Sequence, residues 1–415
     1  MSGQCFSPGE KNIASKKNTV IGKMSLEKAF TPIKLRGLLL KNRFIKTATY
    51  EGMSRNGVPD ERLFAFHGRM AANNVALTTV AYGAVNEDGL THEDQMVIDE
   101  NAVPHLQRLA GTVHEQEGKI SLQLTHCGYF TRSTRFKSRR PLGPSATLNK
   151  YGLVKGRPFS KAMTHDDIRQ TISDFVNAAV IAAGAGFDAI ELHMGHGYLL
   201  SQFLSSAINK RKDEFGGSLE NRMRISIWII REIRKSLGDD YPILCKLNLS
   251  DDFAKGFTLP ECIKAVQMLG LAGVDAVILS GGFTSITPFY LMRGEIPLKE
   301  MIESENDFLQ KLVLRFFGRS IIKKYEFREN FFIDQARQVR KSTRMPLVYV
   351  GGVVSSEGIG QVMEAGFDMI ALGRALIAEP DFLLKVKNSN THQSPCDHCN
   401  ICVGYMEKNG VECVL

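Results

Sequence analysis

The sequence predicts an α/β protein built on one (β/α)8 barrel, or TIM barrel, with loop insertions. Eight short apolar segments alternate with segments of helical periodicity from residue 44 onward. These segments are apolar along nearly their whole length, as in a parallel sheet that is covered on both faces. Eight such units in a row predict a closed barrel rather than an open sheet.

In chain order, the expected strands cover residues 44–49, 75–85, 119–126, 188–194, 242–248, 275–282, 346–352 and 368–374. A partial repeat leads into three of them: AGFDAIELH (185–193), AGVDAVILS (272–280) and AGFDMIALG (365–373). In each copy a Gly suits the left-handed conformation that closes a helix, and an Asp comes just before a buried strand. The repeat supports a regular alternation of helix and strand.

The clearest helix is expected over residues 165–183, where Thr164 and Asp167 make a capping-box-like start. Two connections, residues 127–164 and 283–330, are much longer than the others. Because loops that follow barrel strands carry function, we expect both to cover the substrate side. The apolar residues of the helix recur on one face, namely Ile168, Ile172, Phe175, Val176, Ala179 and Ala183.

The chain is expected to have three parts. Residues 1–24 read as a disordered basic leader, residues 25–390 as the barrel, and residues 391–415 as a cysteine-rich tail. The first residues are polar and lack the apolar core of a secretory signal. With eight cysteines in a reduced state, this predicts an intracellular, cytoplasmic protein.

Amino-acid composition and charge limit the classes of molecule that the protein is expected to bind. Hydrophobic residues make up 43% and charged residues 23%, as in ordinary globular proteins. No stretch of eighteen uncharged apolar residues occurs, so no membrane-spanning helix is expected. The net charge is +8, but Lys and Arg are scattered, and no nucleic-acid-binding module is present. We therefore expect a small-molecule substrate, with neither a membrane nor a nucleic acid as partner; homo-oligomerisation is left open.

Three chemically active side chains lie at the end of the fourth expected strand and in the loop after it, in ELHMGHGYLLSQFLSSAINKRKDEFGGSLENRMR (191–224). Two imidazoles, His193 and His196, can donate hydrogen bonds to a developing oxyanion, and the phenol of Tyr198 can transfer a proton. Active residues of such barrels lie at the carboxyl ends of strands. The three are therefore predicted to be catalytic, although isolated histidines at a strand end are more often satisfied polar groups.

The same string closely resembles the signature of the old yellow enzyme family, the FMN-dependent ene-reductases and NADH:flavin oxidoreductases. The resemblance covers roughly residues 26–388. TAT in the first strand and LMRGEIP (291–297) resemble the branch related to 2,4-dienoyl-CoA and 2-enoate reductases. Further matching motifs are KNRFIKTATYEGM (41–53), QLTHCG (123–128), LVYVGGV (347–353) and IALGRALIAEPDF (370–382).

The resemblance implies an FMN at the carboxyl end of the barrel. Ala48 and Thr49 would bring backbone groups to its ring system, and Tyr82 would line it. Gln123 would hydrogen-bond the pyrimidine edge, because an amide can donate and accept there at once. Lys246 would face the flavin N1 and C2 carbonyl and stabilise the anionic reduced flavin.

The resemblance also implies a phosphate site after strands seven and eight. Gly permits close approach of the backbone, and Arg supplies charge-assisted hydrogen bonds. Two positions depart from the family: Tyr129 follows His126-Cys127-Gly128 where Arg is common, and Tyr50 stands where relatives carry Cys or Thr. The residues expected at the phosphate are Gly351, Gly352, Gly373 and Arg374.

The activity that the resemblance implies is NAD(P)H-driven reduction of the activated C=C bond of α,β-unsaturated carbonyl compounds. Hydride would come from flavin N5 and a proton from Tyr198, while His193 and His196 hold the carbonyl oxygen. Two alternatives stay open: an NAD(P)H oxidase or quinone reductase of the same fold, and a flavin-binding barrel without turnover. The sequence does not distinguish NADH from NADPH.

The tail holds Cys396, Cys399, Cys402 and Cys413 in the spacing C-x2-C-x2-C-x10-C. Four thiols in a reduced compartment suggest a metal site. The related branch binds a [4Fe–4S] cluster with one more residue between the second and third cysteines. We expect free or structural thiols, with a [4Fe–4S] cluster and zinc as the alternatives.

Overall fold

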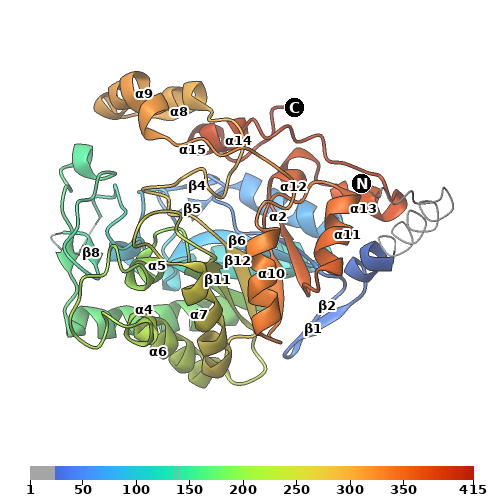
Figure 1. Ribbon diagram of the computed structural model, residues 1–415, viewed down its shortest axis with the longest axis horizontal. Helices are drawn as coiled ribbons and strands as arrows, with labels where there is room; N and C mark the ends of the chain where they lie inside the picture. The colour runs from blue at the N-terminus through green and yellow to red at the C-terminus, as the bar shows by residue number, and fades with distance from the viewer. Residues whose placement is uncertain (1–23, 136, 139) are drawn as a thin grey trace, which may run out of the picture.

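The computed structural model describes residues 24–135, 137–138 and 140–415, and it forms the predicted closed barrel of eight parallel strands (Figure 1). The last strand pairs with the first and closes the ring. The leader expected over residues 1–24 lies, except for Met24, outside the described residues. The barrel strands are β3 (Phe44–Lys46), β6 (Leu77–Ala84), β7 (Lys119–Thr125), β10 (Ala189–Met194), β11 (Ile243–Asn248), β12 (Ala276–Ser280), β13 (Leu347–Tyr349) and β14 (Met369–Leu372).

All eight predicted strands are therefore confirmed, and helices cover the outside of the ring (Figure 1). The predicted helix begins at His165, and the capping box between Thr164 and Asp167 is present. Val176 and Ala183 are only half-buried, since the buried face also takes in Thr171, Ala178 and Ala182. The outer helices are α2 (Glu61–Ala72), α3 (Val103–His114), α4 (His165–Gly184), α6 (Leu219–Leu237), α7 (Leu259–Ala272), α10 (Ile333–Ser342), α11 (Ser356–Glu364) and α13 (Phe382–Asn388).

The repeated Asp before three strands joins neighbouring units of the barrel. Asp188 accepts a hydrogen bond from Ile120 N at 2.9 Å. Asp275 accepts from Ile243 N at 2.8 Å, and Asp368 accepts from Leu347 N at 2.9 Å. Each carboxylate thus receives the backbone amide at the start of the preceding strand. It also pairs with basic side chains of neighbouring elements, namely Lys119 and His114, Arg234 and Arg36, and Arg340.

A hairpin seals the amino-terminal end of the barrel. It consists of β1 (Ile33–Leu35) and β2 (Leu38–Leu40), which pair in antiparallel fashion. Leu35 and Leu40 are buried in one apolar cluster with residues from inside the barrel, such as Ile45, Leu244 and Val348. The interior is therefore filled at this end, and open space remains at the carboxyl ends of the strands.

The two long connections contain secondary structure of their own, which the sequence analysis did not specify. That segment contains α8 (Leu298–Ser304) and α9 (Phe308–Ile321), and Asp307 caps α9 by accepting hydrogen bonds from Leu309 N and Gln310 N. Residues 127–164 contain two short paired strands, β8 (Leu142–Gly143) and β9 (Lys161–Ala162). Within the described part of the chain, no helix combines the length and apolarity needed to cross a membrane.

The cysteine-rich tail packs back over the barrel. Beyond α13 it forms two short helices, α14 (Ile401–Gly404) and α15 (Met406–Asn409). The Asn400 amide donates to Met292 O at 2.7 Å and to Glu295 O at 2.8 Å. Val411 N donates to Glu51 O at 2.6 Å. These bonds hold the tail against the segments that follow β3 and β12.

Candidate active site

One cavity of about 1440 Å³, a volume that includes its opening to solvent, lies at the carboxyl end of the barrel. The carboxyl ends of parallel strands meet at the same edge, so residues far apart in sequence converge there. All twelve residues that the sequence analysis nominated line this cavity: Ala48, Thr49, Tyr82, Gln123, His193, His196, Tyr198, Lys246, Gly351, Gly352, Gly373 and Arg374. Their placement is as expected, while their roles stay predictions.

The three nominated catalytic side chains pack against one another. The ring centroids of His193 and His196 lie 4.9 Å apart, and those of His193 and Tyr198 lie 4.6 Å apart. His196 has a left-handed backbone with φ of 58°, and its Nε2 lies 2.7 Å from Ser280 Oγ. The turn after β10 therefore brings both imidazoles and the phenol to one wall of the cavity.

Burial sets the protonation of this group. It lowers the pKa of His193 well below its ordinary value and that of His196 to about 3, and the neighbouring Lys246 ammonium acts in the same direction. Both imidazoles are thus neutral at physiological pH. Gly195 N donates to His193 Nδ1 at 3.4 Å, so the ring proton of His193 sits on Nε2. Burial raises the pKa of Tyr198 well above 10, which keeps the phenol protonated.

Glu191 joins two nominated residues, and the sequence analysis missed it. Its carboxylate accepts a hydrogen bond from the Gln123 amide at 2.5 Å and pairs with Lys246 Nζ at 2.9 Å, all inside the barrel. In β10 it stands two residues before His193, so both point the same way, and Gln123 lies opposite it in β7. That two-residue period could have identified Glu191. The charge of Lys246 is consequently shared with Glu191 before any ligand binds.

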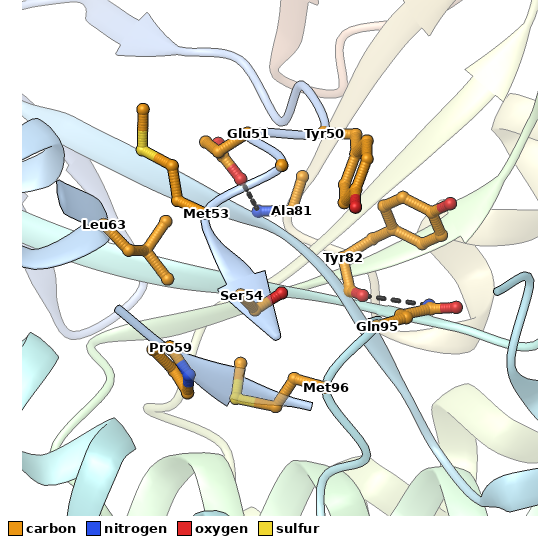
Figure 2. Close-up of a pocket in the computed structure, with 11 residues that line it drawn as sticks. Tyr50, Glu51, Met53, Ser54, Pro59, Leu63, Ala81, Tyr82, Gln95 and Met96 are labelled. Carbon is orange, nitrogen blue, oxygen red and sulfur yellow. Dashed lines mark hydrogen bonds between the residues drawn. The ribbon is translucent and has the colours of Figure 1, made fainter. Parts of the chain in front are cut away.

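A second buried ion pair lies beside a side cavity of about 330 Å³. Glu51 pairs with Lys46, and both side chains are 1% exposed. The other carboxylate oxygen of Glu51 accepts from Ala81 N at 3.3 Å, as Figure 2 shows. Tyr50 and Tyr82 separate this space from the main cavity, with ring centroids 5.7 Å apart. Tyr50, the residue that departs from the family, thus forms part of an aromatic wall.

Three features of the cavity fit the expected FMN. Thr49 Oγ1 is buried without a hydrogen-bond partner. Gly352 lines the cavity with φ of +79°, and a Cβ there would meet the Phe331 ring at 2.6 Å, so only Gly fits at this point of the wall, where its backbone is open to a ligand. Arg374 is half-buried and, among the described residues, has no carboxylate partner; loss of contact with water lowers its pKa. A partly buried guanidinium without an acid is suited to a phosphate.

The tail supplies part of the cavity wall that no sequence pattern indicated. Asn400 Oδ1 accepts a hydrogen bond from Arg374 Nη1 at 2.6 Å. This bond ties the predicted phosphate residue to the tail. The tail residues that line the cavity are His398, Cys402, Val403, Met406 and Val411.

The four tail cysteines line one small cavity beside Arg374. Burial raises the pKa of Cys402 to about 11, and the Arg374 guanidinium opposes that shift. Among the described residues, no three cysteine sulfurs lie within 4.8 Å of one another, whereas sulfurs around one zinc ion lie about 3.8 Å apart. By donor type, four thiolates suit either a zinc ion or an iron–sulfur cluster. That the thiols carry no metal stays a prediction.

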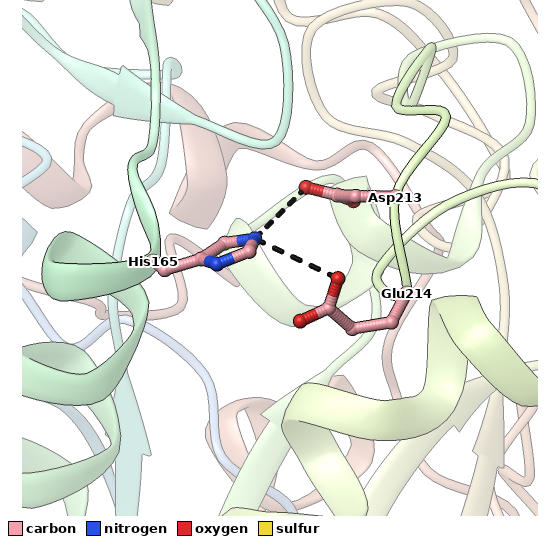
Figure 3. A group of neighbouring side chains, drawn as sticks. All are labelled: His165, Asp213 and Glu214. Carbon is pink, nitrogen blue, oxygen red and sulfur yellow. Dashed lines mark hydrogen bonds and ion pairs between the residues drawn. The ribbon is translucent and has the colours of Figure 1, made fainter.

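A surface cluster of His165, Asp213 and Glu214 has the donor types of a metal site (Figure 3). Nε2 of His165 lies 3.2 Å from Asp213 and 3.7 Å from Glu214. However, Arg211 already binds Asp213 with Nε at 2.9 Å, and this bond lowers the pKa of Asp213 to about 2. The cluster therefore joins the start of α4 to the loop before α6 as an exposed ion pair.

Comparison with known proteins agrees with this geometry. A family model described as NADH:flavin oxidoreductase / NADH oxidase matches residues 28–285. A 4,4'-dithiodibutanoate disulfide reductase of Rhodococcus erythropolis is 37% identical over 392 residues, which cover 93% of this chain and 94% of that protein.

Solved structures share the fold. A 2-naphthoyl-CoA reductase complex matches with a TM-score of 0.78 and 24% identity, over 92% of this chain but only 56% of that one. An old yellow enzyme homologue of Zymomonas mobilis matches with a TM-score of 0.68 and 20% identity, over 90% and 96% of the two chains. The family match, the relative aligned over 94% of its length and the barrel agree: the chain is a flavin-dependent NAD(P)H oxidoreductase and belongs to the NADH:flavin oxidoreductase / NADH oxidase family.

Proposed function

We propose that the enzyme uses NAD(P)H to reduce the activated C=C bond of small α,β-unsaturated carbonyl compounds. The observation that carries this proposal is the grouping of two neutral imidazoles and a protonated phenol on one wall of the cavity. FMN, when bound, supplies the hydride chemistry. A cytoplasmic location and a small-molecule substrate remain part of the proposal.

The residues that would hold FMN are the nine nominated above. Ala48, Thr49 and Tyr82 would contact its rings, and Gln123 and Lys246 its polar edge. Glu191 orients the last two, because it accepts from the Gln123 amide and pairs with the Lys246 ammonium. The phosphate would meet the backbone of Gly351, Gly352 and Gly373 and the guanidinium of Arg374.

The histidines would polarise the substrate. His193 offers its Nε2 proton, and a neutral N–H donor aimed at a carbonyl oxygen stabilises the charge that develops there. His196 is held by Ser280 and, on its backbone, by Asn248, whose Oδ1 accepts from His196 N at 3.1 Å. Such preorganised donors are typically worth about 10²–10³ in rate.

Tyr198 would protonate the α-carbon. Its hydroxyl is hydrogen-bonded to Tyr82, whose ring centroid lies 5.4 Å away. A phenol with a raised pKa keeps its proton until a strongly basic carbon is formed. Tyr82 can then share the negative charge that the proton leaves behind.

The test is Tyr198→Phe. We expect the oxidation of pre-reduced enzyme by cyclohexenone to slow by about 10²–10⁴, because a general acid is lost. Reduction of the flavin by NAD(P)H and its reoxidation by oxygen or a quinone should be unchanged, since neither protonates carbon. Stopped-flow absorbance separates these half-reactions. If the variant reacts with cyclohexenone at an unchanged rate, Tyr198 is not the proton donor. If the native enzyme is reoxidised by oxygen or a quinone far faster than by cyclohexenone, the oxidase or quinone reductase alternative is favoured.

A second candidate is reduction of a small organic disulfide, favoured by the 37% identical relative. The balance is one disulfide, one NAD(P)H and one proton giving two thiols and NAD(P)+. Thiolates leave with pKa values near 8.5, so no carbon is protonated and Tyr198 is dispensable. Turnover of 4,4'-dithiodibutanoate that survives Tyr198→Phe and exceeds turnover of cyclohexenone would favour this candidate over the first.

A further inference from the structure

Helix α9 leaves most of its large apolar side chains in solvent. Phe308 is 70% exposed, Phe316 71% and Phe317 58%, and Ile321 is also 58% exposed. Gly318 is the single buried residue of the helix. The α8–α9 hairpin projects from the body of the protein at the upper left of Figure 1, away from the β1–β2 hairpin that seals the barrel. A surface helix normally turns such side chains inward.

The long connection over residues 127–164 contributes apolar side chains to the same surface. Leu153 and Phe159 are 54% and 57% exposed. The segment touches α9 at two points: Gln310 donates to Tyr151 O at 3.2 Å, and Lys155 Nζ lies 3.6 Å from Asp307. We call residues 147–161 and 308–324 together the apolar rim. Large exposed patches of this kind mark interaction sites.

The apolar rim is also rich in basic residues. Its two segments contain nine Lys and Arg and no Asp or Glu. Four of these cations, Lys155, Lys161, Lys323 and Lys324, pair with acidic residues just outside the rim. Lys311, Arg315 and Arg319 form no ion pair with any residue that the structure describes. Arg315 and Arg319 are exposed, so α9 presents unpaired positive charge together with its exposed apolar side chains.

We propose that the apolar rim binds the surface of an anionic lipid bilayer. A helix that combines exposed Phe, Leu and Ile with Lys and Arg lies in the membrane interface, with apolar side chains among the acyl chains and basic ones on the phosphates. Each Lys or Arg near an anionic surface strengthens this attraction. Such binding needs no spanning helix. The sequence analysis expected no membrane partner, because it found no spanning segment and took the Lys and Arg residues as scattered.

Two other binding partners, a second copy of the chain and single-stranded nucleic acid, fit the charge and the side chains of the apolar rim less well. A symmetric contact with a second copy places the same patch on both partners, so basic residues would face basic residues. Single-stranded nucleic acid binds to aromatic platforms, whereas Leu309, Val313 and Ile321 of the exposed face cannot stack on bases. The inference does not depend on the proposed reaction.

The test is co-sedimentation of the full-length protein with vesicles of phosphatidylcholine alone or mixed with phosphatidylglycerol. Two paired variants probe the rim: Phe316→Glu with Phe317→Glu, and Arg315→Glu with Arg319→Glu. Matched controls lie on α6 and α7: Leu271→Glu, at a side chain that is 88% exposed, and Arg231→Glu with Lys264→Glu. Flavin absorbance and circular dichroism establish that each variant is folded.

We expect the native protein to pellet with the anionic vesicles and to be released by salt. Each rim variant should reduce partitioning by roughly thirtyfold or more, and the controls should not. Three results would overturn the proposal: no pelleting, equal losses in controls and rim variants, or a dimer in sedimentation velocity that Phe316→Glu with Phe317→Glu abolishes. Binding to heparin that matches vesicle binding and ignores the Phe variants would also overturn it.

Discussion

The floor and the roof of the cavity are built in different ways. The floor consists of barrel strand ends, where the hydrogen-bonded ladder fixes each residue; His193 and Lys246, for example, are directly paired across β10 and β11. The roof, on the solvent side of the cavity, consists of the two long connections (residues 127–164 and 283–330) and the tail (391–415). Its residues come from segments that share no ladder with the barrel. The floor is therefore positioned by the strand ladder, and the roof by side-chain contacts and single backbone hydrogen bonds such as that from Val411 N to Glu51 O.

Arg132 shows how the roof is held. It belongs to the first insertion, and its guanidinium pairs with Glu407 of the tail and lies 3.6 Å from Glu305 of the second insertion. It also covers the Tyr151 ring at 5.3 Å. One side chain, 20% exposed, thus connects all three roof segments. Because these contacts depend on individual side chains, substitutions can change the conformation of the roof without changing the barrel strands that form the floor.

The largest expected effect on stability is in the floor, from Glu191→Gln. The substitution leaves Lys246 as an unpaired buried cation, which typically destabilises a protein by about 3–5 kcal/mol. Thermal unfolding of the flavin-free protein measures this. The double variant Glu191→Gln with Lys246→Met should recover much of the loss. Glu232→Gln, in an exposed pair with Lys235 at 3.8 Å, should leave the midpoint unchanged; a similar shift in both would contradict the contrast between buried and exposed pairs.

Arg374→Ala tests the point where floor and roof meet. Removal of a charge-assisted contact to phosphate should weaken FMN binding by about 1.5–3 kcal/mol, or roughly ten- to 150-fold. Fluorescence titration of the apoprotein with FMN gives the dissociation constant. Arg374→Lys keeps the charge and should lose less. Unchanged FMN affinity in the Ala variant would show that the phosphate binds elsewhere.

Asn400→Ala should loosen the roof alone. It removes hydrogen bonds to Arg374, Met292 and Glu295, and it places Ala at φ of 60°, which together should destabilise the tail by about 2 kcal/mol. Hydrogen exchange over residues 396–413 should accelerate while the barrel strands stay protected. The control is Asn56→Ala, at another positive φ of 50°. Equal exchange in the two variants would mean that these bonds do not anchor the tail.

The smallest effect concerns acid stability of the floor. Burial lowers the pKa of His196 to about 3, against about 6.5 when unfolded, so below pH 6.5 the unfolded chain binds the extra proton. Stability is thus complete above pH 6.5 and falls with pH, by up to about 1.4 kcal/mol per unit for one such group. His196→Asn should flatten this fall in the unfolding midpoint between pH 6.5 and 5. The control His105→Asn, outside the cavity, should leave this pH dependence unchanged. If the midpoint falls with pH equally steeply in both variants, His196 is not buried as a neutral ring.

The hydrophobic periodicity of the sequence was sufficient to predict the strands that form the floor. Buried apolar runs separated by helical patterns identified all eight strands, and residues at their carboxyl ends then had to meet at one edge. Glu191 was within reach of the same reasoning, because it shares the inward face of β10 with His193. The resemblance to a known family added which of these residues contact the flavin, and those roles stay predictions.

What the sequence by itself determined is the barrel, because local periods of two and 3.6 residues decide which side chains are buried. His193, His196 and Tyr198 followed from their place at a strand end, and the nine residues expected at the flavin came from the resemblance to a known family. Only the tertiary structure decided the roof. The contact between Arg132 and Glu407 spans 275 residues, and no local pattern encodes a pairing at that distance. The same holds for the exposed face of α9: its amphipathic pattern predicts a buried stripe, and only the fold reveals that no other described part of the chain covers it.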